Sequence, residues 1–155
     1  LCRQYKNMFS LNYNILRFFT VYSENQPNSN TGGLMIGKFA RLAKEGKALT
    51  VHGDGEFKRD YIHVTDVAKA CIASIESRVK NEIFNVGTGT NISVNDVVKI
   101  IKEFKPDVQV INEENPRGYA RDTLADISKA KKLLGWSPEI NQKEGIELTF
   151  RKLLT

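Results

Sequence analysis

The run GDGEFKRDYIHVTDV at residues 53–67 constrains the fold more than any other part of this chain. Its two glycines can adopt positive φ without the steric penalty of a Cβ atom, so we expect the chain to reverse tightly between strands at 49–52 and 61–64. The bend presents Arg59, whose planar and permanently charged guanidinium suits a phosphate or diphosphate. An ordinary Asp-Gly turn with a surface arginine is the alternative interpretation of this spacing.

Short apolar strands alternate with amphipathic helices along the chain, which predicts the α/β fold class. We expect strands near residues 14–21, 49–52, 61–64, 82–86 and 108–111. We expect helices near residues 1–11, 34–46, 65–76, 93–106, 128–134 and 143–154. Thr65, Ser93 and Asp126 are the expected helix caps, and Ser93 with Asp96 forms a capping-box pattern. The helix after Thr65 is expected to turn Val67, Cys71, Ile72 and Ile75 inward.

Composition excludes several classes of protein. The chain has 155 residues, 41% of them hydrophobic and 26% charged, which is typical of a globular domain with a real core. No apolar run approaches the roughly 18 residues of a membrane span, and the N-terminus shows no signal segment, so we expect a cytoplasmic protein without a membrane partner. Cys2 and Cys71 lack metal-ligand spacing, so we predict neither a metal site nor a disulfide.

The net charge of +5 suits an anionic partner. We nevertheless expect no nucleic-acid partner, because the lysines are spread over several helices. No basic patch is interleaved with aromatic residues of the kind that stack bases. The charge by itself does not single out one anionic partner.

Four motifs follow one another in the order typical of an enzyme family. They are LRFFTVY at 16–22, the run at 53–67, IFNVG at 83–87, and ADISKA at 125–130 followed by LGWSP at 134–138. With these motifs, residues 14–149 resemble the C-terminal half of the NAD-dependent nucleotide-sugar epimerase/dehydratase family, the extended short-chain dehydrogenases/reductases. Within that family the chain is most similar to UDP-glucose 4-epimerase-like proteins.

The resemblance implies a divided architecture, because two or three strands cannot complete a doubly wound sheet. Residues 1–22 would end a Rossmann-type NAD-binding domain, and residues 23–80 would form the first part of a small α/β substrate-binding domain. Residues 81–92 would return a strand to the Rossmann domain, and residues 93–155 would complete the substrate-binding domain. The family's Tyr-x-x-x-Lys pair and glycine-rich pyrophosphate turn are both missing from this sequence, so we expect a fragment with no catalytic residue of its own.

Several substrate-binding residues are implied by the same resemblance. Arg59 matches the arginine that binds the nucleotide diphosphate, and Asp60 is expected to orient it. Arg117 matches a second arginine from a late loop, with a solvated loop arginine as the equal alternative. Gly33 lies where backbone N–H groups at a helix start can bind an anion.

Thr50 and His52 alternate onto one face of a strand, where the resemblance places the nucleotide base. A solvent-facing pair is the alternative. Thr20 would face the sugar; many relatives carry asparagine there, and a hydroxyl slightly favours a uronic-acid substrate. Phe19 would contact the nicotinamide end of the NAD cofactor.

The expected function is therefore the substrate-binding part of an NAD-dependent nucleotide-sugar 4-epimerase of the UDP-glucose/galactose or UDP-uronic acid type. The parent enzyme would be a homodimeric isomerase that holds NAD mainly in its N-terminal half, and this chain alone would be inactive. A sugar-nucleotide 4,6-dehydratase or reductase of the same family remains open. The alternative of another class is a non-catalytic nucleotide-sugar-binding module.

Overall fold

The computed structural model describes residues 1–25, 34–115 and 121–154 and has the expected α/β class. Its helices are α1 (Cys2–Phe9), α2 (Met35–Lys44), α3 (Val64–Glu76), α4 (Val94–Phe104), α5 (Ser128–Leu134) and α6 (Gln142–Leu154). Its strands are β1 (Asn14–Phe18), β2 (Thr20–Tyr22), β3 (Leu49–His52), β4 (Lys58–Arg59), β5 (Tyr61–His63), β6 (Glu82–Val86), β7 (Ile92–Ser93) and β8 (Val110–Glu113). None of the helices in this part of the chain is long and apolar enough to cross a membrane.

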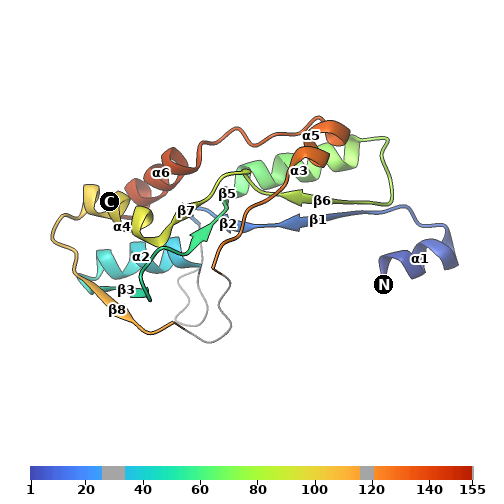
Figure 1. Ribbon diagram of the computed structural model, residues 1–155. Coiled ribbons are helices and arrows are strands. Elements are labelled where there is room, and N and C mark those ends of the chain that lie inside the picture. The colour runs from blue at the N-terminus through green and yellow to red at the C-terminus, as the bar shows by residue number, and fades with distance from the viewer. Residues whose placement is uncertain (26–33, 116–120, 155) are drawn as a thin grey trace.

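Most strand pairs are parallel. β1 pairs with β6, β2 with β5, and β3 with β8, while the short strands β4 and β7 pair antiparallel. Figure 1 shows β1 and β6 side by side between α3 and α1, and β3 and β8 at the other end beside α2. The single strand expected at 14–21 is interrupted at Phe19, so that β1 and β2 take different partners.

The predicted tight reversal between residues 49–52 and 61–64 is wrong. β3 and β5 lie in different sheets, because β3 pairs with β8 and β5 pairs with β2. The glycines do take the expected positive φ, 61° at Gly53 and 72° at Gly55. They turn the chain toward β4, which pairs with β7 instead of closing a hairpin on β3.

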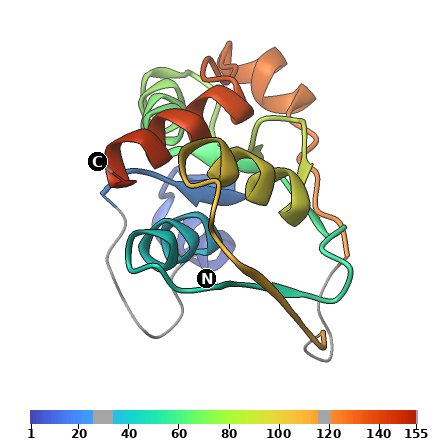
Figure 2. The same cartoon turned by 90° about the vertical axis from the view of Figure 1, so that its left-hand side faces the viewer.

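Two hydrophobic cores hold the elements together. The first lies among α2, α4, α6 and β3, and its most buried members include Tyr22, Ile36, Phe39, Leu49, Val97, Ile101, Ile146 and Phe150. The second packs α3 and α5 against β6, with Ile62, Val67, Ala70, Phe84, Val86, Ala125, Ile127, Ala130 and Trp136. β5 joins the two cores, since Tyr61 belongs to the first and Ile62 to the second. Figure 2 shows α2, α4 and α6 gathered at the end that holds the first core.

The face of α3 differs from the prediction. Ile72 and Ile75 were expected inside but are 54% and 77% exposed, and Cys71 is half-buried. Asp66 is fully buried instead, and its Oδ2 accepts the Ile140 N–H at 3.0 Å. The buried residues of α3 are Asp66, Val67, Ala70 and Ser74, so Val67 lies inside as expected and the two isoleucines lie on the outward face.

The helix caps differ from the prediction in two places. His63, not Thr65, caps α3, with Nδ1 accepting the Thr65 N–H at 3.3 Å. Ile127 occupies the cap position of α5, although the Asp126 carboxylate accepts the Ser128 N–H at 3.0 Å. The capping box of Ser93 and Asp96 on α4 is confirmed.

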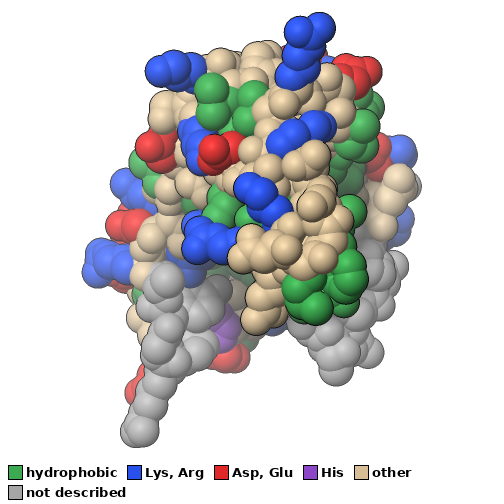
Figure 3. Space-filling view, turned by 90° about the vertical axis from the view of Figure 1, so that its right-hand side faces the viewer, with side chains coloured by type: hydrophobic (Ala, Val, Ile, Leu, Met, Phe, Trp, Pro, Cys, Tyr) green, Lys and Arg blue, Asp and Glu red, His purple; other side chains and the backbone are tan. Residues whose placement is uncertain are grey.

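The first helix is exposed throughout. The rings of Tyr5 and Phe9 of α1 pack against each other at a tilt, with centroids 5.4 Å apart. Met8 beside them is also exposed. On the end of the molecule where α1 lies, hydrophobic side chains appear among lysines and arginines (Figure 3).

Candidate nucleotide-binding site

A cavity of about 180 Å³ opens between α2, β3 and the start of α4. Its walls are Met35, Lys38 and Phe39 from α2, Thr50 and His52 from β3, and Phe57 and Val94. Thr50 and His52 reach it together because they alternate along β3 with the buried Leu49 and Val51. The two residues predicted to share a face therefore share a cavity.

The chemistry of the cavity suits a flat, polar-edged ring. Phe39, Phe57 and Val94 supply apolar surface, and the Thr50 hydroxyl and the His52 ring supply hydrogen-bonding groups. His52 Nδ1 is buried, and among the described residues nothing hydrogen-bonds to it. Leaving such an atom unpaired costs about 1–3 kcal/mol.

The positive end of a helix meets the same cavity. Met35 is the first residue of α2, and among the described residues no side chain caps the helix at Leu34. The first-turn N–H groups and the helix dipole therefore favour negative charge there. The ammonium of Lys38, one turn further on, adds a full charge. An anionic group attached to a bound ring is electrostatically favoured at this edge.

Arg59 lies on β4 and is not itself one of the residues that line the cavity. It follows Phe57 by two residues, about 7 Å along an extended chain, and it pairs with Ile92, two residues before Val94. Its Nη1 donates to the carbonyl oxygens of Lys58 at 2.8 Å and Arg121 at 2.9 Å. These two bonds orient the guanidinium of a side chain that is itself only partly buried.

Asp60, which is expected from the sequence to orient Arg59, makes no direct ion pair with it. Its carboxylate is fully buried and accepts hydrogen bonds from Thr88, Gly89 and Ala125. The reason is burial, because a carboxylate at this depth is satisfied mainly by backbone N–H groups. The side chain of the neighbouring Arg59 lies on the opposite face of the extended chain.

Phe19 and Thr20 lie at the carboxyl end of β1, apart from the walls of the cavity. The Phe19 N–H donates to Val86 O, and the Thr20 N–H donates to Asp60 O, both at 3.0 Å. This is the edge at which open parallel sheets bind ligands. Gly33 and Arg117 lie outside the described residues.

Sequence reasoning missed Lys38, Phe57 and Val94. A local signal existed for Phe57, which stands two residues before Arg59 inside the 53–67 run. Lys38 and Val94 come to β3 from other parts of the chain, so they carried no local signal.

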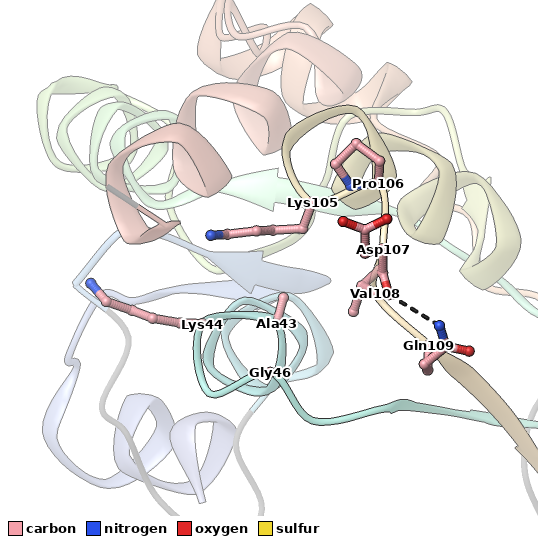
Figure 4. A pocket seen from close by; sticks show the side chains of 8 residues that line it. All are labelled: Ala43, Lys44, Gly46, Lys105, Pro106, Asp107, Val108 and Gln109. Atoms are coloured by element: carbon pink, nitrogen blue, oxygen red, sulfur yellow. Dashed lines mark hydrogen bonds between the residues drawn. The ribbon is translucent and has the colours of Figure 1, made fainter.

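A larger cavity of about 420 Å³ lies at the far end of α2, lined by Lys44, Lys105 and Asp107 among others (Figure 4). None of the described site residues named above lines it. It lies where α2 and α4 end, so helix carbonyls face it, and the two lysines there offset the negative helix ends. That polarity does not suit a diphosphate.

Comparison with known proteins gives a consistent picture. The family profile described as NAD dependent epimerase/dehydratase family matches residues 1–87. The UDP-glucuronate 4-epimerase of Thermodesulfobacterium geofontis is 34% identical over 153 residues, covering 94% of this chain and 44% of that protein. A putative UDP-glucose 4-epimerase of Methanocaldococcus jannaschii is 38% identical over 144 residues, covering 92% and 46%.

Among solved structures, the UDP-glucose 4-epimerase of Thermotoga maritima with UDP-glucose matches with a TM-score of 0.89 at 32% identity. The match covers 97% of this chain and 48% of that one. The fold is therefore that of Rossmann-type epimerases. The chain belongs to the NAD dependent epimerase/dehydratase family, as its motifs predicted, and it spans about half the length of the curated relatives it matches.

Proposed function

We propose that this chain is the nucleotide-sugar-binding part of an NAD-dependent UDP-sugar 4-epimerase. The observation that carries the proposal is the cavity in which Thr50 and His52 meet Phe57, two residues before Arg59 in the chain. The uracil base lies against Phe57 and bonds to Thr50 and His52. The relatives named as UDP-glucose and UDP-glucuronate 4-epimerases support UDP as the nucleotide.

The diphosphate of the nucleotide binds at the positive edge of the cavity. Arg59 supplies a planar fork of N–H donors, and the Lys38 ammonium and the start of α2 add positive potential. Anchoring the diphosphate there leaves the sugar to extend toward the carboxyl end of β1. The Thr20 hydroxyl then hydrogen-bonds to the sugar, which is a hexose or a uronic acid.

The role of these residues is orientation. Binding energy from the nucleotide holds the sugar in one position, which removes much of the entropic cost of the reaction. Phe19 would be this chain's contact with NAD, which would be held mainly by the N-terminal half of the parent enzyme and would supply hydride transfer there. The chain alone therefore binds nucleotide-sugar without turning it over.

The division of the chain into an NAD-binding and a substrate-binding domain is a prediction, to which the packing of the second core adds one observation. We propose that residues 1–22 and 81–92 belong to the NAD-binding domain, and that residues 23–80 and 93–155 belong to the substrate-binding domain. α3 and residues 125–136 pack in the same core as β6, so they form the junction between the two. The parent enzyme is proposed to be a homodimer.

The test is a calorimetric titration of the chain with UDP. Replacing Arg59→Gln removes charge-assisted bonds worth about 1.5–3 kcal/mol, so UDP should bind roughly 10- to 100-fold more weakly. Lys58→Gln is the matched control, because it removes the same charge from the adjacent, exposed position. Equal losses in both variants, or no binding of UDP by the unmodified chain, would contradict the proposed function.

A turnover assay tests whether residues 1–155 catalyse the reaction by themselves. UDP-glucose is incubated with the chain and NAD, and the product is analysed for UDP-galactose. We expect none from this chain. Measurable epimerisation would show that the chemistry lies in residues 1–155 and would refute the assignment of these residues to binding alone.

A further inference from the structure

Asp60 is a fully buried carboxylate that joins three separate parts of the chain. Its Oδ1 accepts the N–H and the hydroxyl of Thr88, both at 2.7 Å. Its Oδ2 accepts the N–H groups of Gly89 at 3.0 Å and Ala125 at 3.1 Å. Four donors on one buried carboxylate hold the loop at residues 88–89 and the segment at Ala125 in fixed positions relative to Asp60.

The packing around the carboxylate leaves no spare room. At Gly87 an added Cβ atom would lie 2.7 Å from Asp60 Oδ2 and 2.5 Å from the Ala125 Cβ. The loop that follows β6 and the segment that ends at Ala125 are thus both pressed against the carboxylate. Movement of either one would break hydrogen bonds at a site that water does not reach.

The segment held at Ala125 also carries the partner of Arg59. Residues 121–123 run beside β4, where the Lys58 N–H donates to Arg121 O and the Thr123 N–H donates to Lys58 O, both at 3.1 Å. The Arg121 carbonyl in turn accepts the Arg59 Nη1 bond at 2.9 Å. A continuous path of hydrogen bonds and backbone therefore runs from the Asp60 carboxylate to the Arg59 guanidinium.

We propose that Asp60 is a positioning residue for the nucleotide diphosphate, which holds residues 121–125 against β4 and thereby fixes the guanidinium of Arg59. The inference rests on the proposed function, in which Arg59 binds the diphosphate. Asp60 also anchors Thr20, whose N–H donates to its main-chain oxygen, so both predicted substrate contacts meet at one residue.

The chemistry requires a carboxylate at this position. An asparagine has the same shape but one acceptor oxygen, so its NH₂ group would face two of the four donors. Those two donors are buried and would lose their partners, which favours release of a neighbouring segment. Asp60→Asn therefore tests the connection with almost no change in volume.

The experiment is a double-mutant cycle read by calorimetric titration with UDP, on the chain and its Asp60→Asn, Arg59→Gln and doubly substituted variants. Concentrations are corrected for the folded fraction measured by circular dichroism. We expect Asp60→Asn to weaken UDP binding roughly tenfold, and to have little further effect once Arg59 is replaced. Loss of affinity in the Arg59→Gln background equal to that in the unmodified chain would overturn the proposal.

The matched control is Asp66→Asn, which neutralises another fully buried carboxylate. Its Oδ2 accepts the Ile140 N–H, and its hydrogen bonds do not reach β4. We expect UDP affinity within about twofold of the unmodified chain. An equal loss in Asp60→Asn and Asp66→Asn would show a general structural effect and refute the positioning role.

Thr88→Val extends the test to a milder change. It removes one donor from Asp60 Oδ1 while keeping the side-chain volume, so it decides the question if Asp60→Asn does not fold. We expect a smaller loss of UDP affinity that again disappears with Arg59→Gln. Full affinity in Thr88→Val and Asp60→Asn, with UDP bound by the unmodified chain, refutes this inference alone. Absence of UDP binding in the unmodified chain refutes the proposed function.

Discussion

Gly145 marks a place where a single methyl group should measurably destabilise the fold. It lies in the first half of α6, where a Cβ atom would overlap the Tyr22 hydroxyl and lie 2.8 Å from Ile140 Cγ2. Tyr22 is 1% exposed, and its ring contacts the edge of His63 with centroids 5.3 Å apart, so it has little freedom to withdraw.

The expected magnitude for Gly145→Ala is the difference of two effects. Alanine gains up to about 1 kcal/mol over glycine in a helix interior. Overpacking a filled core costs about 1–3 kcal/mol. We expect a net loss of about 1–2 kcal/mol in the free energy of unfolding, measured by urea denaturation followed by circular dichroism.

Tyr22→Phe separates the close contact from other causes. The Tyr22 hydroxyl is buried, and among the described residues it has no hydrogen-bond partner, so its removal should change stability little. Removing it also removes the overlap, and the double variant should recover part of the loss caused by Gly145→Ala. A Gly145→Ala chain that is more stable than the original would refute the close approach of α6 to Tyr22.

Two further predictions concern single hydrogen bonds. Trp136→Phe removes the indole N–H that donates to Asp66 O at 3.2 Å in the second core, and should lower the free energy of unfolding by about 1–3 kcal/mol, measured by urea denaturation. The hydrogen bond from the Ser93 hydroxyl lowers the pKa of Asp96 in the folded chain, so this bond stabilises the fold above pH about 4 and its contribution is lost as the pH falls through that lowered pKa. Ser93→Ala should cost about 1 kcal/mol at pH 7 and flatten the loss of stability on acidification, and an unchanged pH profile would contradict the capping box.

Local interactions were readable from the sequence. The capping box of Ser93 and Asp96, the positive φ angles of Gly53 and Gly55, and the helix end at Gly135 all depend on residues within a few positions of one another. The family followed from the order of its motifs. Thr50 and His52 share a cavity wall because side chains alternate along any strand.

Long-range partners were decided only by the tertiary structure. Which strand pairs with β3 or β5 depends on contacts across the chain, and the local turn signal at residues 53–57 wrongly favoured a hairpin. The inward face of α3 depends on Asp66 meeting Ile140, which lies 74 positions away. The same holds for the Asp60 carboxylate, whose hydrogen-bond partners are 28 to 65 positions distant.

One physical reason explains why some features could be predicted from the sequence and others could not. Backbone conformation, capping and side-chain alternation depend on neighbours in sequence, so the order of residues by itself determined the elements, their class and the family. Burial of a polar or apolar group depends on what packs against it from elsewhere, because each buried carboxylate must find donors and each strand must find a partner. The tertiary structure alone therefore decided how the strands pair, how Lys38 and Val94 come to the cavity beside β3, and what holds the Arg59 guanidinium.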